Sequence, residues 1–232
     1  MTDDKQTISV AIETTCRNGG VALGRDGGLL ATLDFDAAGR AATHLITSLD
    51  VLLSAQGLKP VDIDEVYIAV GPGSFTGTRV GVTVARTLAQ TVPSLRCVAV
   101  PTPRAVILQA ETSLDNAAVV LDAGDGLAHI TPFARADGIF RQSGQPVLGP
   151  AAEWLNAAAR PIFLIGEGLG YHDCTGPEVT LADESAWLPT PTSVWTAGVG
   201  LASAGDFVEY HHLLPIYARP PKAVVSSKGK KT

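Results

Sequence analysis

The apolar residues at the start of the chain recur in short runs with the spacing of β-strands. Residues 7–14, 21–24 and 29–36 are apolar and rich in β-branched side chains, and polar or glycine-rich segments separate them. The Asp26-Gly27 pair between the second and third runs is a strong hairpin signal. Because a parallel connection needs about a dozen residues or more, the three runs predict neighbouring antiparallel strands.

From residue 41 the apolar positions take the spacing of a helix instead. Within 41–56 they recur on one helical face, and Gly57 with Pro60 supplies the stop signal. Strands and helices then alternate, with a strand over 65–70, a helix over 78–92, a strand over 96–100 and a helix over 103–111. This order predicts a mixed sheet with right-handed crossovers, as in a ribonuclease-H-like half-domain.

The remainder of the chain is less regular and predicts a smaller second lobe. Strands are expected at 118–122, 128–134 and 161–165, and helices at 151–159 and 193–204. The interval 166–192 has glycines, prolines and few periodic positions, so it is expected to be loop. We therefore expect a lobe over 1–110, a lobe over 111–212, and a segment over 213–232 that returns to the first lobe and ends in a basic tail.

Composition and charge exclude several classes of protein. The 232 residues are 46% hydrophobic and carry a net charge of −6, which argues against a protein whose whole surface binds nucleic acid. The apolar runs are too short for a signal-peptide core or a membrane span. The three cysteines form no metal-ligand pattern, so we expect reduced thiols in a cytoplasmic protein that does not bind a membrane.

The most distinctive motif is GPGSFTGTRVG, residues 71–81, between a predicted strand and a predicted helix. Free backbone N–H groups at such a position favour an anion, and the candidate anion-binding residues are Gly71, Gly73, Ser74, Thr76 and Gly77. The motif lacks the lysine of a Walker loop and the spacing of a dinucleotide fingerprint. A tight strand-to-helix corner is the alternative interpretation, and the residues alone favour it.

Small residues form a stripe along the helix that follows this motif. Gly81, Ala85 and Ala89 recur every four residues and would let a second helix approach closely. If the stripe and the leucine-rich face of 41–56 lay on the surface, they would form an apolar docking patch. Packing within the chain is the alternative.

Two acidic residues and three histidines are candidates for chemistry. Glu13 and Asp122 end predicted strands, where each could orient a metal-bound phosphate or accept hydrogen bonds from a turn. His44 has no second histidine one helical turn away, and the adjacent His211 and His212 point to opposite faces of an extended segment. Since the sequence has no nucleophile elbow either, we predict neither a catalytic residue nor a metal ligand.

Four stretches together resemble the bacterial TsaB family, also called YeaZ. They are Ala11-Ile12-Glu13-Thr14-Thr15, His44 in its helix, residues 71–81, and the LPIYAR string over 214–219. The resemblance runs from about residue 10 to residue 110 and returns at the last stretch. It implies the actin/Hsp70-like fold of two ribonuclease-H-like lobes with mixed sheets. It also implies a role in forming N6-threonylcarbamoyladenosine at position 37 of tRNA, in which a TsaD-type enzyme performs the transfer and a TsaE-type ATPase joins the complex.

The resemblance further implies a non-catalytic partner that activates the TsaD-type subunit. TsaD-type chains share the glycine-rich motif but are longer and carry a two-histidine metal motif, whereas this chain offers His44 alone. No cofactor of its own is therefore expected, with ATP and metal on the partner subunits and tRNA reached through the complex. The implied partner interface, which a homodimer would share, comprises His44, Leu45, Ser48, Leu49, Leu52, Gly81, Val82, Ala85 and Ala89.

The chain departs from the family pattern at two positions, and two alternative functions stay open. Glu13 stands where Asp is usual, and Gly124 stands where Arg is common after Asp122-Ala123. The alternative function is an enzyme of the same superfamily, either a small ATP-binding phosphotransferase or a peptidase-like protein. Direct tRNA contact through the tail is a third hypothesis, set against a solvated tail; the basic residues are Arg219, Lys222, Lys228, Lys230 and Lys231.

Overall fold

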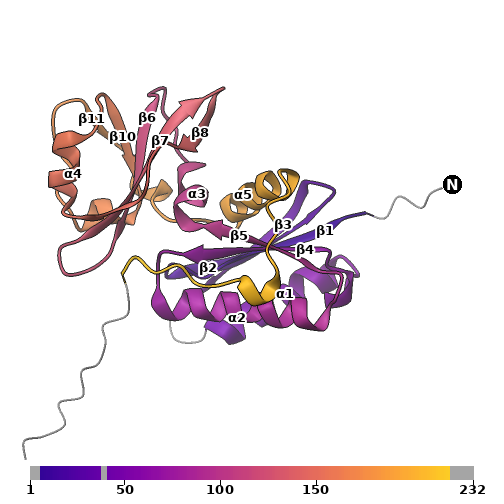
Figure 1. The fold of residues 1–232 in the computed structure, drawn as a ribbon. Coiled ribbons are helices and arrows are strands. Elements are labelled where there is room, and N and C mark those ends of the chain that lie inside the picture. Colours follow the sequence, from indigo (N-terminus) through magenta and orange to yellow (C-terminus); the bar gives the residue numbers. More distant parts are fainter. Residues whose placement is uncertain (1–5, 38–40, 220–232) are drawn as a thin grey trace, which may run out of the picture.

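In the computed structural model, which describes residues 6–37 and 41–219, two mixed β-sheets form the centres of two lobes (Figure 1). Of the predicted basic tail, Arg219 is described and the four lysines lie outside the described residues. Within the described ranges, no helix is long and apolar enough to cross a membrane. The three cysteines are free thiols and are buried.

The first lobe, called the N-lobe, is built on a five-stranded sheet in the order β3-β2-β1-β4-β5. The first three strands along the chain are antiparallel neighbours, whereas β1, β4 and β5 run parallel. The predicted hairpins and the predicted mixed sheet are therefore confirmed. The bounds are β1 (Ile8–Glu13), β2 (Asn18–Arg25), β3 (Gly28–Asp36), β4 (Glu65–Gly71) and β5 (Arg96–Pro101).

Two long helices cover one face of this sheet. α1 (Ala41–Ala55) and α2 (Phe75–Thr91) contact each other and turn their apolar sides onto β1, β2 and β4. Ser74 is the N-cap of α2, and its hydroxyl oxygen accepts a hydrogen bond from the Gly77 N–H. Leu213, from the far end of the chain, is fully buried in the same core. This side of the N-lobe is therefore closed by residues from both ends of the sequence.

Helices from two distant parts of the sequence cover the other face of the N-lobe sheet. α3 (Thr102–Ile107) follows β5, and α5 (Pro191–Ser203) comes after the second lobe and returns to the first. Glycines allow α5 to lie close to the sheet. A Cβ at Gly24 would come closer than 3.0 Å to the Trp195 ring, and one at Gly198 would come equally close to Tyr67.

The position of α5 corrects the expected division of the chain. The sequence predicts a second lobe over 111–212, but α5 contacts β1, β2, β4 and β5 of the N-lobe. The small and apolar residues of this helix indicate burial without indicating which sheet covers them, so the predicted boundary falls too late. The second lobe, called the C-lobe, ends before α5 begins.

The C-lobe sheet has six strands, in the order β11-β10-β6-β7-β8 with β9 paired to β7. Three of its strands, β8, β9 and β11, are missing from the sequence prediction because runs of three or four residues show no clear period. β11 lies in the interval expected to be loop, between the short 3₁₀ helices η2 (Glu167–Gly170) and η3 (Glu184–Ala186). The other elements are β6 (Asn116–Asp122), β7 (Ala128–Ala136), β8 (Ile139–Gln142), β9 (Val147–Gly149), α4 (Ala151–Ala157), β10 (Ile162–Ile165) and β11 (Val179–Leu181).

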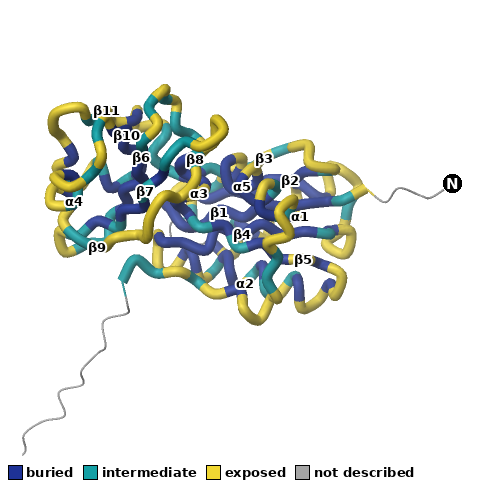
Figure 2. The backbone as a smooth tube through the Cα atoms, turned by 45° about the horizontal axis from the view of Figure 1, so that its top comes forward, coloured by how far each residue is buried: buried dark blue, intermediate teal, exposed yellow. Residues whose placement is uncertain are grey.

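The short helix α3 contributes to the cores of both lobes. Ala105 packs in the N-lobe cluster with α5, whereas Val106 and Ile107 pack against β6 and β10 of the C-lobe. α4 covers the opposite face of the C-lobe sheet. Figure 2 shows the buried segments at the centre of each lobe. The two lobes thus meet around α3.

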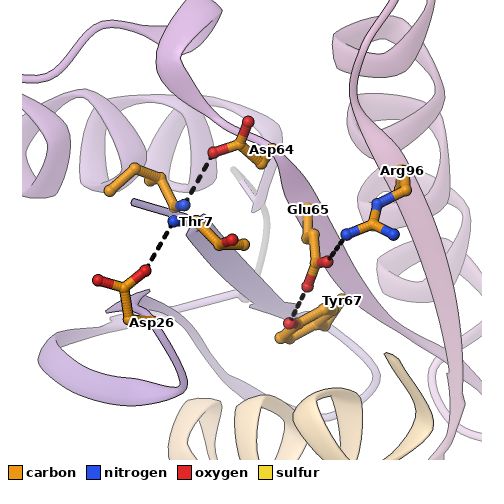
Figure 3. Close-up of polar contacts among 7 residues, drawn as sticks. Thr7, Asp26, Asp64, Glu65, Tyr67 and Arg96 are labelled. Carbon is orange, nitrogen blue, oxygen red and sulfur yellow. Dashed lines mark hydrogen bonds and ion pairs between the residues drawn. The ribbon is translucent and has the colours of Figure 1, made fainter. Parts of the chain in front are cut away.

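A polar network fixes the ends of the N-lobe strands where β4 and β5 begin (Figure 3). The buried Glu65 carboxylate accepts a hydrogen bond from the Tyr67 hydroxyl and pairs with the Arg96 guanidinium. Burial, together with the Glu65 carboxylate, raises the pKa of Tyr67 above its usual range, so its hydroxyl stays a donor. At the same end of the sheet, the Thr7 N–H donates to Asp26 at 2.8 Å. The candidate functional residues lie where these strands end instead.

Candidate functional site

The carboxyl ends of β1 and β4 meet at one corner of the N-lobe. These strands are parallel neighbours, so the residues after Glu13 lie beside the loop that begins at Gly71. The Ser74 N–H donates to the Thr15 carbonyl oxygen at 2.6 Å, and the Thr14 hydroxyl donates to the Gly77 carbonyl oxygen at 2.8 Å. The motif over 71–81 is therefore bonded to the segment that follows β1, through the Thr15 backbone and the Thr14 side chain.

The glycines of the motif are explained by this close packing. A Cβ at Gly73 would come closer than 3.0 Å to the Thr15 carbonyl oxygen, and one at Gly77 would come equally close to that of Thr14. Gly71 has a φ of +98°, a conformation that favours glycine. Each glycine thus lets one segment of backbone pass another, which is the strand-to-helix corner that the sequence favours.

The same contacts bear on the candidate anion-binding loop. Of its N–H groups, that of Ser74 is donated to Thr15 and that of Gly77 to the Ser74 hydroxyl. Thr76 is exposed at the start of α2. The Ser74 and Gly77 N–H groups are therefore not available to an anion at the start of α2. The geometry supports a strand-to-helix corner more than an anion-binding site.

Glu13 lies at the end of β1 with its side chain wholly buried. One carboxylate oxygen accepts hydrogen bonds from the Thr15 N–H and from the Thr15 hydroxyl, the latter at 2.7 Å. The other carboxylate oxygen has no hydrogen-bond partner among the described residues. Desolvation by burial raises the pKa of Glu13 to about 7, although the bonds from Thr15 oppose the shift. The side chain is therefore held against a turn, which is one of the two roles expected for it.

Acidic residues from the C-lobe lie at the same junction. Asp122 ends β6, and its carboxylate oxygen lies 3.0 Å from His172 Nε2. Burial and the Asp122 charge raise the pKa of Glu167. Burial, with the charges of Glu13 and Glu167, raises the pKa of the Cys16 thiol, so acids of both lobes act on the same thiol.

Within the described ranges, no group of three or more histidine, cysteine, aspartate and glutamate side chains is arranged to hold a metal ion.

The glycine-rich string after β10, like the motif over 71–81, has a structural role. A Cβ at Gly166 or at Gly168 would come closer than 3.0 Å to Val120 of β6, so these glycines let η2 pack against that strand. The strand ends of both lobes are thus closed by contacts within the chain.

The predicted partner-interface residues require a correction. Eight of the nine are buried against the N-lobe sheet by the chain itself, namely Leu45, Ser48, Leu49, Leu52, Gly81, Val82, Ala85 and Ala89. The ninth, His44, is half-buried, with its Nδ1 atom 2.9 Å from the Asp36 carbonyl oxygen. The reason is that an amphipathic helix on a sheet turns its apolar stripe inward. The stripe of small residues is therefore used within the chain.

The outward side of the two helices carries a different set of residues, here called the outer face of α1 and α2. On α1, Ile46 is 57% exposed and Val51 is 49% exposed. On α2, the half-buried residues Val80, Val84 and Leu88 alternate with exposed polar ones. The periodicity of 41–56 assigns Ile46 to the same helical face as the leucines, but the structure turns it outward. Periodicity does not find isolated apolar residues on the polar side of a helix, so Val51 and the α2 positions were missed.

Sequence reasoning also missed a surface groove of about 620 Å³. Its lining combines the start of β2 and the end of β3 with the segment that leads into α5, including Arg17, Asp34, Asp36 and Glu184. These segments are more than a hundred residues apart in the chain, and no local pattern connects them.

Comparisons with known proteins agree with this architecture. Residues 36–156, just over half of the chain, match the family model described as TsaD, tRNA N6-adenosine threonylcarbamoyltransferase. Among curated proteins, the chain is 24% identical to the Bacillus subtilis tRNA threonylcarbamoyladenosine biosynthesis protein TsaB, covering 92% of this chain and 95% of that protein. It is 26% identical to the Escherichia coli protein of the same description, covering 95% of this chain and 98% of that protein.

Two solved structures from Pseudomonas aeruginosa have the same fold. One is described as similar to peptidase YeaZ and superposes with a TM-score of 0.79 at 24% identity, over 92% of this chain and all of that one. The other is described as YeaZ and superposes with a TM-score of 0.77 at 24% identity, over 91% of this chain and 99% of that one. With the mixed sheets seen here, these matches confirm the predicted actin/Hsp70-like fold of two lobes.

Proposed function

The chain belongs to the tRNA N6-adenosine threonylcarbamoyltransferase family and, within it, to the TsaB (YeaZ) proteins, and we propose that it binds and activates a TsaD-type partner without a catalytic site of its own. Its role lies in the biosynthesis of threonylcarbamoyladenosine in tRNA. The partner performs the transfer at position 37, and this chain supplies a binding surface.

The observation that carries the non-catalytic role is the closure of the strand-end corner. Residues 71–77 are bonded to the Thr15 carbonyl oxygen and to the Thr14 hydroxyl, and the nearby buried acid Glu13 is bonded to Thr15. A catalytic cleft needs groups that are free to contact a substrate. Here the groups that most resemble such a site hold the fold together.

The outer face of α1 and α2 is the proposed contact surface. Ile46 and Val51 expose apolar area on helices whose inner sides pack on a five-stranded sheet. A rigid support of this kind lowers the ordering cost of binding, because little of the surface has to be fixed when the partner arrives. A second copy of this chain would bind through the same face and would compete with the partner.

The other assignments belong to the same proposal. A TsaE-type ATPase joins the complex, ATP and metal are held by the partner subunits, and tRNA is reached through the complex. The protein acts in the cytoplasm, where its buried thiols Cys16, Cys97 and Cys174 stay reduced.

The test compares the affinities of the wild-type and Ile46→Asp chains for a TsaD-type subunit, measured by biolayer interferometry. A charge placed in a desolvated interface should weaken binding about tenfold or more. Ile139→Asp is the matched control, because Ile139 is 55% exposed, much like Ile46, but lies on β8 of the C-lobe. Equal affinities for wild type and Ile46→Asp would mean that the outer face of α1 and α2 does not contact the partner.

Calorimetry of the isolated chain with ATP and magnesium tests the enzyme alternative. The proposal predicts no heat of binding at micromolar concentrations and no turnover. Micromolar binding together with turnover would favour a phosphotransferase instead.

A further inference from the structure

The last described segment of the chain runs back along the N-lobe after η4 (Tyr210–His212). Leu213 is fully buried in the N-lobe core. The Ile216 N–H donates to the Val70 carbonyl oxygen at 2.6 Å, at the end of β4. A Cβ at Gly71 would come closer than 3.0 Å to the Ile216 carbonyl oxygen, so glycine is needed where the segment crosses the strand. The segment is thus fixed to the N-lobe at two points.

A ring contact fixes the same segment to the start of α2. The Tyr217 and Phe75 rings pack with their centroids 5.0 Å apart and their planes inclined by 31°. The Arg79 guanidinium lies 5.1 Å from the centroid of the Phe75 ring. Aromatic pairs at this separation stabilise contacts beyond the area that they bury. This is the third attachment point on the N-lobe.

The segment then reaches the C-lobe (Figure 1). The Arg219 Nη1 atom lies 2.6 Å from a carboxylate oxygen of Asp125, in the turn between β6 and β7. A Cβ at Gly124 would come closer than 3.0 Å to the Arg219 guanidinium. The guanidinium therefore lies directly against the turn between β6 and β7.

We propose that residues 213–219 form a strap that restrains the angle between the two lobes, with the Arg219–Asp125 pair as its releasable end. The lobes are joined covalently by residues 108–115, after α3, and by residues 182–190, before α5. The lobes also pack around α3, which contributes to both cores, and the strap adds a further non-covalent connection between side chains 94 residues apart in sequence. It is attached to the N-lobe by a buried leucine, a backbone hydrogen bond and a ring contact, but to the C-lobe by an ion pair at the surface.

The ion pair is the weak end of the strap. Its side chains are 29% exposed for Arg219 and 57% exposed for Asp125. Ion pairs between partly exposed groups are modest and are screened by salt. Two states are compared, one with the strap attached to the C-lobe and one with it detached. We therefore expect breaking the pair to change the ratio of attached to detached chains by about two- to fivefold. Such a change alters a population without unfolding either lobe.

Distances between the lobes test the strap. Nitroxide labels are placed at Ser54→Cys on α1 and Asn156→Cys on α4, both exposed, while the native cysteines are buried. Double electron–electron resonance on the full chain should give a narrow distance distribution for the labelled protein. Arg219→Gln should broaden or shift it, and so should raising the salt concentration to about 1 M, where the screening length is about 3 Å.

A double-mutant cycle separates the pair from other effects of the substitution. Asp125 has a φ of +54°, which Asn tolerates, so Asp125→Asn removes the charge without straining the turn. If the strap acts through this pair, Arg219→Gln should change nothing further in the Asp125→Asn background. Arg141→Gln, on an exposed residue of β8, is the control and should leave the distribution unchanged. An unchanged distribution in Arg219→Gln, or additive effects in the cycle, would overturn the proposal.

Discussion

The two lobes are built on sheets of similar size, but their helices differ. The N-lobe sheet has helices of 15 and 17 residues on one face and the 13-residue α5 on the other. In the C-lobe the corresponding helix, α4, has 7 residues, and four strands have four residues or fewer. Stability that comes from packed helix faces is therefore concentrated in the N-lobe. The difference indicates that the N-lobe is the rigid support of the molecule and that the C-lobe is the more easily altered part.

The glycines between α5 and the N-lobe sheet offer the largest effect. In Gly198→Ala the new Cβ would come closer than 3.0 Å to the Tyr67 ring, so α5 would have to move off the sheet. Overpacking of this kind should lower the free energy of unfolding by about 3 kcal/mol, measured by urea denaturation. Gly200→Ala is the control on the same helix, because nothing lies within 4 Å of its Cβ. There the better helix propensity of alanine should stabilise the chain by a few tenths to about 1 kcal/mol. Equal effects at the two positions would contradict tight packing of α5.

The buried acid of the N-lobe gives the next effect, and its sign depends on pH. Burial raises the pKa of Glu13 from 4.5 to about 7, so the folded chain holds this proton after the unfolded chain has lost it. Wild-type stability should therefore fall as the pH rises from 4.5 to 7, by about 2–3 kcal/mol from this group, and then level off. Glu13→Gln should lack that fall. The free energy of unfolding of Glu13→Gln minus that of wild type should therefore be larger at pH 8 than at pH 4.5.

Denaturation curves at several pH values measure the difference between the two chains. Glu153→Gln, on the exposed side of α4, is the control for removing one carboxylate. Parallel stability–pH curves for wild type and Glu13→Gln would mean that the Glu13 carboxyl is not desolvated in solution.

The smallest effect is expected at the edge of the C-lobe. Leu181 ends β11, the edge strand of that sheet, and is 41% exposed. Leu181→Ala should cost less than about 1 kcal/mol, because little apolar area is lost and no cavity forms. The same substitution at Leu53, 1% exposed in the N-lobe core, should cost about 2–5 kcal/mol. Comparable losses at the two leucines would mean that the C-lobe edge is as well packed as the N-lobe core.

The same contrast explains what could be predicted from the sequence. In the N-lobe, the helix expected over 41–56 is observed over Ala41–Ala55, because long periodic segments and glycine stops are strong signals. In the C-lobe, β8, β9 and β11 are too short to show a period. The fold class was therefore predictable, whereas the details of the second lobe were not.

The candidate site was predictable only in part, for a different reason. The sequence located the apolar stripe of α1 and α2, but whether a stripe faces a sheet or a partner is decided by the rest of the chain. Leu45 and Ala85 are accordingly buried, and Ile46 lies outside. Contacts between distant residues left no local pattern either. Arg219 and Asp125 are an example, since each is an ordinary turn or tail residue by itself.

The proposed role is tested by the yield of N6-threonylcarbamoyladenosine in tRNA, measured by mass spectrometry of the nucleosides. The mixture contains tRNA, an activated threonylcarbamoyl donor, ATP with magnesium, a TsaD-type subunit and a TsaE-type ATPase. We expect no product from this chain alone, full yield when wild-type chain is added to the mixture, and a strongly reduced yield with Ile46→Asp but not with Ile139→Asp. Product formed by this chain without the TsaD-type subunit, or an Ile46→Asp chain as effective as wild type, would contradict a non-catalytic subunit that works through the outer face of α1 and α2.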